Sequence, residues 1–347
     1  THAGDPCTGG VQCNDTCNEA SDDCFSPSGW VCADDGNACT SDVCGGSGAC
    51  THPPNAASCD EGLFCNGADV CSGGTCTHTG VPCAACDTCD EATDACVTPS
   101  AIVRVTNDPA GSSEPMLVWN GGGYGVAWTD GRDGNAEIYF ARLDASGSAL
   151  GSATRVTIDA ATSEGISLVW TGAGYGISWY DLRDGNYEIY LARLDAAGVK
   201  LGGDIRVTNN PSTSWGASLA WNGTGYGVTW GDNRDGNYEI YFARVDASGA
   251  LVGGNVRVTT AAASSDSPSL VWNGGSYGLA WSDWRNGGSE IYFAQLDPLG
   301  TRVGSDVRVT TATGSSGLPS IVWNGTGYGL GWEDSRSGAQ VLYFVRL

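Results

Sequence analysis

The sequence predicts an all-β protein in which a five-bladed β-propeller of four-stranded antiparallel blades follows a small disulfide-rich domain. Three observations support this prediction. A tryptophan recurs every 51 residues, at Trp119, Trp170, Trp221, Trp272 and Trp323. Each copy contains four short β-rich runs separated by glycine turns, which is typical of a propeller blade. All 16 cysteines lie between Cys7 and Cys96, ahead of the repeats.

The composition changes sharply along the chain and predicts two domains, residues 1–100 and residues 101–347. The first contains every cysteine and lacks lysine and arginine. Closely spaced cysteines in even number, with little apolar material, predict a disulfide framework in an oxidising compartment and leave its connectivity open. The motif Cys86-x-x-Cys89 has no separate CxxC elsewhere in the chain and no following histidine, so the framework is favoured over zinc or haem.

The charge balance restricts the partners. The formal net charge is −23, from 16 Lys+Arg and 39 Asp+Glu. Nucleic acids and anionic membrane surfaces are also negative, so neither is an expected partner. Apolar runs stay well below the roughly 18 residues that cross a bilayer, and membrane insertion is not expected. We expect a secreted protein, extracellular or at a cell surface.

The four strands of a blade can be followed in the first copy. The run PMLVWN at Pro115–Asn120 precedes a glycine turn, and GVAW at Gly125–Trp128 follows it. The loop DGRDGN leads into EIYFARLD at Glu137–Asp144, and an RVT run at Arg155–Thr157 ends the copy. Such runs between Asp-Gly and Ser-Gly turns predict an antiparallel meander, with the large aromatic residues packed between blades.

The two ends of the repeat array predict how the ring closes. The last copy ends at Leu347, after its third strand, whereas AIVRVT at Ala101–Thr106 precedes the first copy without partner strands. We therefore expect Ile102–Thr106 to pair with the strand near Tyr343 as the outer strand of the last blade. Closure would remove an exposed sheet edge. An open stack of blades is the alternative.

The repeat resembles the Tol-type and WD-like propeller repeats of bacteria. The residues of the first copy that carry this resemblance are Trp119, Trp128, Asp130, Arg132, Asp133, Gly134, Asn135, Glu137, Ile138, Tyr139, Asp144 and Gly147. It implies the fold and leaves the function open, because propellers host enzymes, lectins and scaffolds. The cysteine pattern of residues 30–80 resembles CxDG…CxxGxC modules of secreted bacterial surface proteins, which implies an extracellular spacer.

An Asp-x-Arg motif occurs in every copy. A carboxylate two residues from a guanidinium can form a bidentate pair that holds its loop. The alternative is a ring of charged groups that binds a polar ligand on one face. The candidate ligand-binding residues are Asp130, Arg132, Asp181, Arg183, Asp232, Arg234, Asp283, Arg285, Asp334 and Arg336.

The RDGN.E segment that follows is a candidate calcium loop in the first three copies. Its oxygen-bearing side chains alternate around a glycine, as in calcium-binding loops, although the full DxDxDG pattern is missing. The alternative is a plain Asp-Gly turn. The candidate metal ligands are Asp133, Asn135, Glu137, Asp184, Asn186, Glu188, Asp235, Asn237 and Glu239. Calcium is the one cofactor considered, and haem and nucleotides are not expected.

Two tryptophans depart from the repeat and are further candidates for ligand binding. Trp215 takes a position held elsewhere by Ser113, Glu164, Asp266 and Gly317, and Trp284 takes one held by Gly131, Leu182, Asn233 and Ser335. Both positions belong to the face where the DGRDGN loops meet the connections between blades. An aromatic platform there suits a sugar ring, and incidental packing is the alternative.

A non-catalytic binding or adhesion protein is the function that these features favour, with a glycan or a surface protein as partner and calcium as an aid. The run SLVWN of the inner strand carries no acid in any copy, and residues 101–347 contain no histidine, so an enzyme is not expected. A structural protomer that self-assembles into a filament or surface layer is the first alternative. A glycoside-acting enzyme is the second. The sequons at Asn14, Asn222 and Asn324 matter only in a host that glycosylates.

Overall fold

A computed structural model describes residues 17–18, 23–24, 31–45, 49–83, 88–92, 95–97 and 102–347. The chain separates into two compact units, Thr1–Ile102 and Val103–Leu347. This boundary lies two residues beyond the one that composition predicts. The sequon at Asn14 falls outside the described residues, whereas Asn222 and Asn324 lie in hairpin turns.

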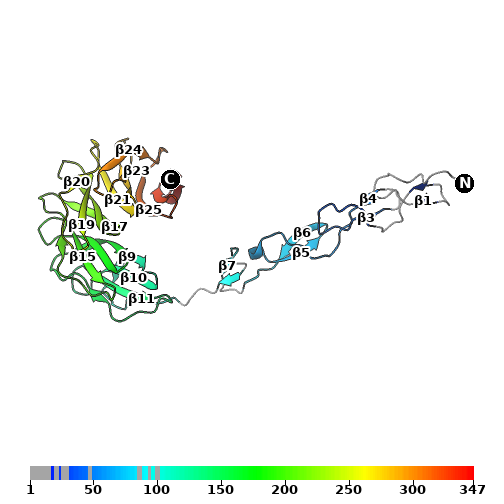
Figure 1. Ribbon diagram of the computed structural model, residues 1–347, viewed down its shortest axis with the longest axis horizontal. Helices are drawn as coiled ribbons and strands as arrows, with labels where there is room; N and C mark the ends of the chain where they lie inside the picture. The colour runs from blue at the N-terminus through cyan, green and yellow to red at the C-terminus, as the bar shows by residue number, and fades with distance from the viewer. Residues whose placement is uncertain are drawn as a thin grey trace. The chain divides into compact units, whose positions relative to one another are not determined.

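The first unit is a series of two-stranded antiparallel hairpins held by disulfides (Figure 1). The hairpins are β1 (Cys17–Asn18) with β2 (Asp23–Cys24), β3 (Val43–Cys44) with β4 (Cys50–Thr51), β5 (Ala68–Ser72) with β6 (Thr75–Thr79), and β7 (Thr88–Asp90) with β8 (Ala95–Val97). A 3₁₀ turn, η1 (Phe64–Asn66), precedes β5.

The disulfides fall into two sets. In one set each bridge closes the segment around a single hairpin, and in the other each bridge joins segments that belong to different hairpins. The bridges among the described residues are Cys32–Cys50, Cys59–Cys76 and Cys83–Cys96 in the first set, and Cys39–Cys71 and Cys65–Cys89 in the second. These bonds confirm the predicted framework and indicate an oxidising compartment.

The second unit is the five-bladed β-propeller that the repeat predicts (Figure 1). Blade 1 contains β9 (Ser112–Trp119), β10 (Gly123–Asp130), β11 (Glu137–Asp144) and β12 (Thr154–Arg155). Blade 2 contains β13 (Ser163–Trp170), β14 (Gly174–Asp181), β15 (Glu188–Asp195) and β16 (Ile205–Arg206). Blade 3 contains β17 (Ser214–Trp221), β18 (Gly225–Asp232), β19 (Glu239–Asp246) and β20 (Val256–Arg257). Blade 4 contains β21 (Ser265–Trp272), β22 (Tyr277–Asp283), β23 (Glu290–Leu296) and β24 (Arg302–Arg308), and the last sheet contains β25 (Ser316–Trp323), β26 (Tyr328–Asp334) and β27 (Val341–Arg346). Among the described residues, no helix is long and apolar enough to cross a membrane.

The apolar residues of the repeat pack one blade against the next, as expected. Between blades 1 and 2, Ile138 and Phe140 join a buried cluster with Leu168, Tyr175 and Trp179. The tyrosine of one blade lies over a glycine of the preceding blade. A Cβ on Gly125 would lie 2.5 Å from the Tyr175 ring, so any larger residue would separate the blades.

A β-bulge interrupts the inner strand of every blade at the same repeat position. The register of β13 on β14 shifts between Glu164 and Ser167, and the other blades shift at the matching place. The bulged residue has positive φ in every blade, and it is Glu114, Gly165, Gly216, Ser267 and Leu318. Because a bulge redirects neighbouring side chains, these five positions shape the centre of the propeller.

The expected strand closure is not present, and this prediction is wrong. Ile102–Thr106 contains no strand, and β27 pairs with β26 alone. In blade 1 the RVT run is anchored by Glu137, which accepts hydrogen bonds from Thr157 and Arg155. The matching position of the last blade is Val341. Without that carboxylate, Arg104 and Thr106 have no anchor on β27.

Candidate ligand site in the central funnel

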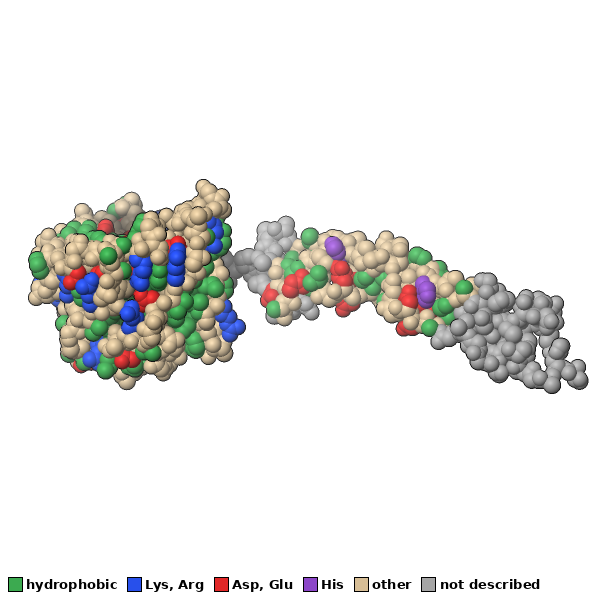
Figure 2. All heavy atoms as spheres, turned by 90° about the horizontal axis from the view of Figure 1, so that it is seen from above, with side chains coloured by type: hydrophobic (Ala, Val, Ile, Leu, Met, Phe, Trp, Pro, Cys, Tyr) green, Lys and Arg blue, Asp and Glu red, His purple; other side chains and the backbone are tan. Residues whose placement is uncertain are grey.

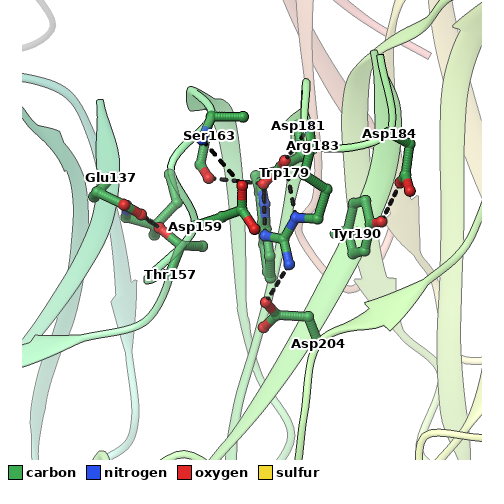
Figure 3. A network of polar contacts seen from close by, with 12 residues as sticks. Glu137, Thr157, Asp159, Ser163, Trp179, Asp181, Arg183, Asp184, Tyr190 and Asp204 are labelled. Carbon is green, nitrogen blue, oxygen red and sulfur yellow. Dashed lines mark hydrogen bonds and ion pairs between the residues drawn. The ribbon is translucent and has the colours of Figure 1, made fainter. Parts of the chain in front are cut away.

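A buried aspartate organises the end of each blade. In blade 2, Asp181 accepts hydrogen bonds from Trp179 Nε1 at 3.0 Å and Ser163 Oγ at 2.8 Å (Figure 3). Arg183 donates its Nε to the same carboxylate at 2.9 Å, and its guanidinium lies 4.3 Å from the centre of the Tyr190 ring. We name this Trp–Asp–Arg–Tyr set the blade brace, and it recurs in all five blades.

The blade brace explains the Asp-x-Arg motif as a structural element. Its aspartate is at most 1% exposed in every blade, so little of the carboxylate remains for a ligand. In blade 1 the hydrogen bond from Arg132 holds the pKa of Asp130 well below its usual range. The arginines keep 18–28% of their side chains exposed. Ligand binding by the Asp–Arg pairs stays a prediction, and the arginine is the accessible partner.

The candidate calcium ligands also have partners within the protein. Asp184 accepts hydrogen bonds from Tyr190 and lies 3.2 Å from Arg206, and buried Glu188 lies 3.1 Å from the same guanidinium. The amide of Asn186 donates to two backbone carbonyls of the blade connection, Asn210 at 3.1 Å and Ser212 at 2.7 Å. Blades 1 and 3 repeat this arrangement. Calcium binding stays a prediction, and an ion would have to displace an arginine.

The centre of the propeller is a funnel where the bulges of several blades meet. It encloses about 320 Å³. The bulged Gly165, Gly216, Ser267 and Leu318 line it, each with the residue that follows. Two aromatic side chains complete the wall: Tyr180 from β14 and Trp215 from β17. The wall of the funnel is therefore built from bulged backbone that recurs in each blade and from side chains that differ from blade to blade.

Three carboxylic acids lie on the bulged segments of three blades. Glu114 accepts hydrogen bonds from Thr129 Oγ1 at 3.0 Å and from the backbone N–H of Gly165, in the next blade, at 2.9 Å. Burial, with the nearby Glu114 charge, raises the pKa of Glu164. Burial also raises the pKa of Asp266, although hydrogen bonds from Ser267 and Trp284 act in the opposite direction and lower it in part.

The aromatic residues of the funnel are held by their neighbours. Glu164 and Tyr180 are direct cross-strand partners, and burial together with the Glu164 and Glu114 charges raises the pKa of Tyr180 to about 12. Trp215 packs edge-on against Tyr238, with 5.9 Å between ring centres. Its indole Nε1 is buried and has no hydrogen-bond partner. Tyr180 therefore keeps its proton at neutral pH, and the Trp215 indole has an unused donor.

Of the two predicted tryptophans, Trp215 lines this funnel. Trp284 is not one of its lining residues; it is 44% exposed and hydrogen-bonded to Asp266. The loops after each second strand do adjoin the blade connections, as Gly131 N–H donates to Gly111 O at 3.2 Å.

The run SLVWN is free of acids in every copy, but the inner strands are longer than this run. The strands begin before the SLVWN run and include Glu114, Glu164 and Asp266. Sequence reasoning missed Glu114 and Tyr180 as site residues. A comparison of the five copies could have identified Tyr180, because the matching positions of the other copies hold Thr129, Gly231, Ser282 and Glu333.

The visible face of the first unit carries acidic side chains beside its two described histidines (Figure 2). His52 Nδ1 lies 2.6 Å from Asp42, and His78 Nδ1 lies 2.9 Å from Glu61. Each of these histidines follows a Cys-Thr pair, at Cys50–Thr51 and at Cys76–Thr77.

Neither a family model nor a curated protein sequence matches this chain. Solved structures with a similar fold include a GH43 endo-arabinanase from Bacillus licheniformis, at 12% identity and a TM-score of 0.42, which covers 70% of this chain and 96% of its own. An endo-arabinase from Bacteroides thetaiotaomicron matches at 12% identity and a TM-score of 0.45, covering 67% of this chain and 93% of its own. A puromycin-hydrolyzing peptidase from Mycobacterium tuberculosis matches at 17% identity and a TM-score of 0.46, covering 68% of this chain and 37% of its own. Likeness at these levels concerns the fold alone.

Proposed function

We propose that this chain is an extracellular, non-catalytic binding protein that holds a carbohydrate in the central funnel of its propeller. The observation that carries the proposal is that Trp215 and Tyr180 line the funnel, with Glu164 directly opposite Tyr180 across β13 and β14, at positions where the blades differ. We also propose that the repeats are of the Tol type and that the protein is located at the cell surface.

The chemistry of the funnel suits a polyhydroxylated ligand. The apolar face of a sugar ring packs on an aromatic side chain, and carboxylates accept hydrogen bonds from its hydroxyl groups. The unpartnered indole N–H of Trp215 can donate to a ring or hydroxyl oxygen. The volume of about 320 Å³ is within the size range of small-molecule sites.

The test is a glycan array with the disulfide-intact chain, followed by calorimetric titration of the best oligosaccharide. Trp215→Ala and Glu164→Gln should each weaken binding about tenfold or more, which corresponds to about 1.4 kcal/mol. The matched control is Trp119→Ala, since this tryptophan is 49% exposed but lies outside the funnel. Binding that survives both funnel substitutions, or no binding to any glycan, would overturn the proposal.

A glycoside-acting enzyme is the second candidate, and one observation favours it. Glu164 and Asp266 come from different blades, and burial raises the pKa of each, as a general acid requires. Release of reducing ends from a bound oligosaccharide, lost in both Glu164→Gln and Asp266→Asn, would identify catalysis. Binding without release would support the binding function.

A further inference from the structure

The outer end of the last blade exposes a face that the other four blades bury. Leu342 is 81% exposed, whereas its counterparts Ile138, Ile189, Ile240 and Ile291 are 0% exposed. Phe344 is 71% exposed, whereas the matching Phe140, Leu191, Phe242 and Phe293 are at most 7% exposed. We name this the trailing face, defined by Val322, Leu342 and Phe344.

Blade 1 exposes part of the opposite face. Leu117 is 63% exposed, whereas its counterparts Leu168, Leu219, Leu270 and Ile321 are 3–8% exposed. Trp119 beside it is 49% exposed. We name this the leading face, defined by Met116, Leu117 and Trp119. Large apolar residues gathered at both ends of a repeat array are typical of surfaces that bind a partner.

The two faces are complementary because the repeat makes them so. Where blade 1 meets blade 2, Ile138 and Phe140 pack against Leu168 and Tyr175 in one buried cluster. On the trailing face, Leu342 and Phe344 occupy the positions of Ile138 and Phe140. On the leading face, Leu117 occupies the position of Leu168. A trailing face can therefore cover a leading face with the same contacts that join neighbouring blades.

Blade 1 already carries part of the contact that a preceding blade would make with it. Arg104–Thr106 lies beside this blade, where Val105 lines a cavity of about 300 Å³ with Val126 and Trp128. Arg104 Nε donates to Thr106 O at 2.7 Å, as Arg155 does to Thr157 O at 2.9 Å in the interior RVT run. Blade 1 thus carries a segment with the same local contact as the outer RVT run of an interior blade.

We propose that the propeller associates head to tail, with the trailing face of one copy covering the leading face of a second copy. A second copy supplies the matching face, and both faces are exposed among the described residues. Such a contact joins two different surfaces, so it builds rings or chains rather than a closed two-fold dimer. The proposal is independent of ligand binding in the funnel.

The test is sedimentation of the full, disulfide-intact chain over a wide concentration range. The weight-average mass should rise from 35.6 kDa to at least twice that value with concentration. Leu342→Asp on the trailing face and Leu117→Asp on the leading face should each weaken association about 100-fold, because each buries an unpaired charge in the contact. Both positions are more than 60% exposed in the single chain, so circular dichroism should show an intact fold.

Mixing the two variants provides the sharper measurement. Each keeps one good face, so the mixture should form a heterodimer and no larger species, while each variant alone stays monomeric. The matched control is Val199→Asp, at a turn residue that is 57% exposed and lies on neither face, and it should associate like the parent chain. A parent chain that is monomeric throughout, variants that associate normally, or a mixture that stays monomeric would each overturn the proposal.

Discussion

Replacing the buried aspartate of a middle blade tests the blade brace. Asp232 is fully buried and accepts hydrogen bonds from Trp230 Nε1 at 3.0 Å, Ser214 Oγ at 2.8 Å and Arg234 Nε at 2.8 Å. In Asp232→Ala, the Trp230 and Ser214 donors remain buried without an acceptor. Each costs about 1–3 kcal/mol, whereas the 25% exposed Arg234 regains water. We expect a loss of about 4 kcal/mol in the free energy of unfolding.

The assay is urea unfolding followed by circular dichroism, with exchange of the Trp230 indole N–H followed by NMR. The control is Asp246→Ala, which removes a partly exposed aspartate at the end of β19 that accepts hydrogen bonds from Ser248 and Ala250. It should cost much less than Asp232→Ala and leave the indole protected. Equal losses from the two substitutions would show that the brace contributes no more than an ordinary turn.

The pH dependence supplies a second check on the same variant. Burial alone would raise the pKa of Asp232, but hydrogen bonds from Arg234, Trp230 and Ser214 outweigh it and lower that pKa. A carboxylate with a lowered pKa stabilises the fold above its unfolded pKa of about 3.9, and this stabilisation is lost as the pH falls through the folded value. The deficit of Asp232→Ala should therefore persist at pH 5 and shrink below about pH 3. A deficit that vanished at pH 5 would contradict the bonding pattern.

Three further predictions concern other parts of the chain. Glu164→Gln and Asp266→Asn should each raise the unfolding midpoint at pH 7, because burial raises the pKa of each acid and its ionised form opposes folding. This gain in midpoint should fade towards pH 4, and calorimetry at pH 7 and pH 4 would measure it. Millimolar calcium or EDTA should leave the unfolding midpoint unchanged, since Arg155, Arg206 and Arg257 already pair with the candidate ligands; a rise with calcium would identify an ion site. Dithiothreitol should unfold the first unit and leave the propeller transition in place, because all cysteines precede Val97, as circular dichroism with and without reductant would show.

The sequence was sufficient for the fold because the same contacts recur at a fixed spacing. Trp128 lies opposite Tyr139 across β10 and β11, and the other four blades repeat that pair in register. Five aligned copies leave little choice of strand order. The disulfide connectivity had no such constraint, since many pairings satisfy the same spacing and the folded hairpins select among them.

Ring closure was the part of the fold where pattern alone was misleading. The run at Arg104–Thr106 matches the interior outer strands in sequence, so pairing with β27 was the economical expectation. Whether this run pairs with β27 depends on the residues of β27 itself. There Val341 takes the place of the buried glutamate that anchors Arg155 and Thr157 in blade 1. A strand motif therefore predicts pairing only when the residues that receive it are present as well.

The candidate site was only partly predictable for a related physical reason. Residues that recur in all five copies, such as Asp181 and Arg183, form the brace and are needed by every blade. A single funnel surrounded by repeating blades becomes specific only at positions where the copies differ. Trp215 and Tyr180 are such positions, and both line the cavity. In a propeller with nearly identical blades, the departures from the repeat that face the axis are thus the best guide to the ligand site, and the repeated charges are a guide to stability.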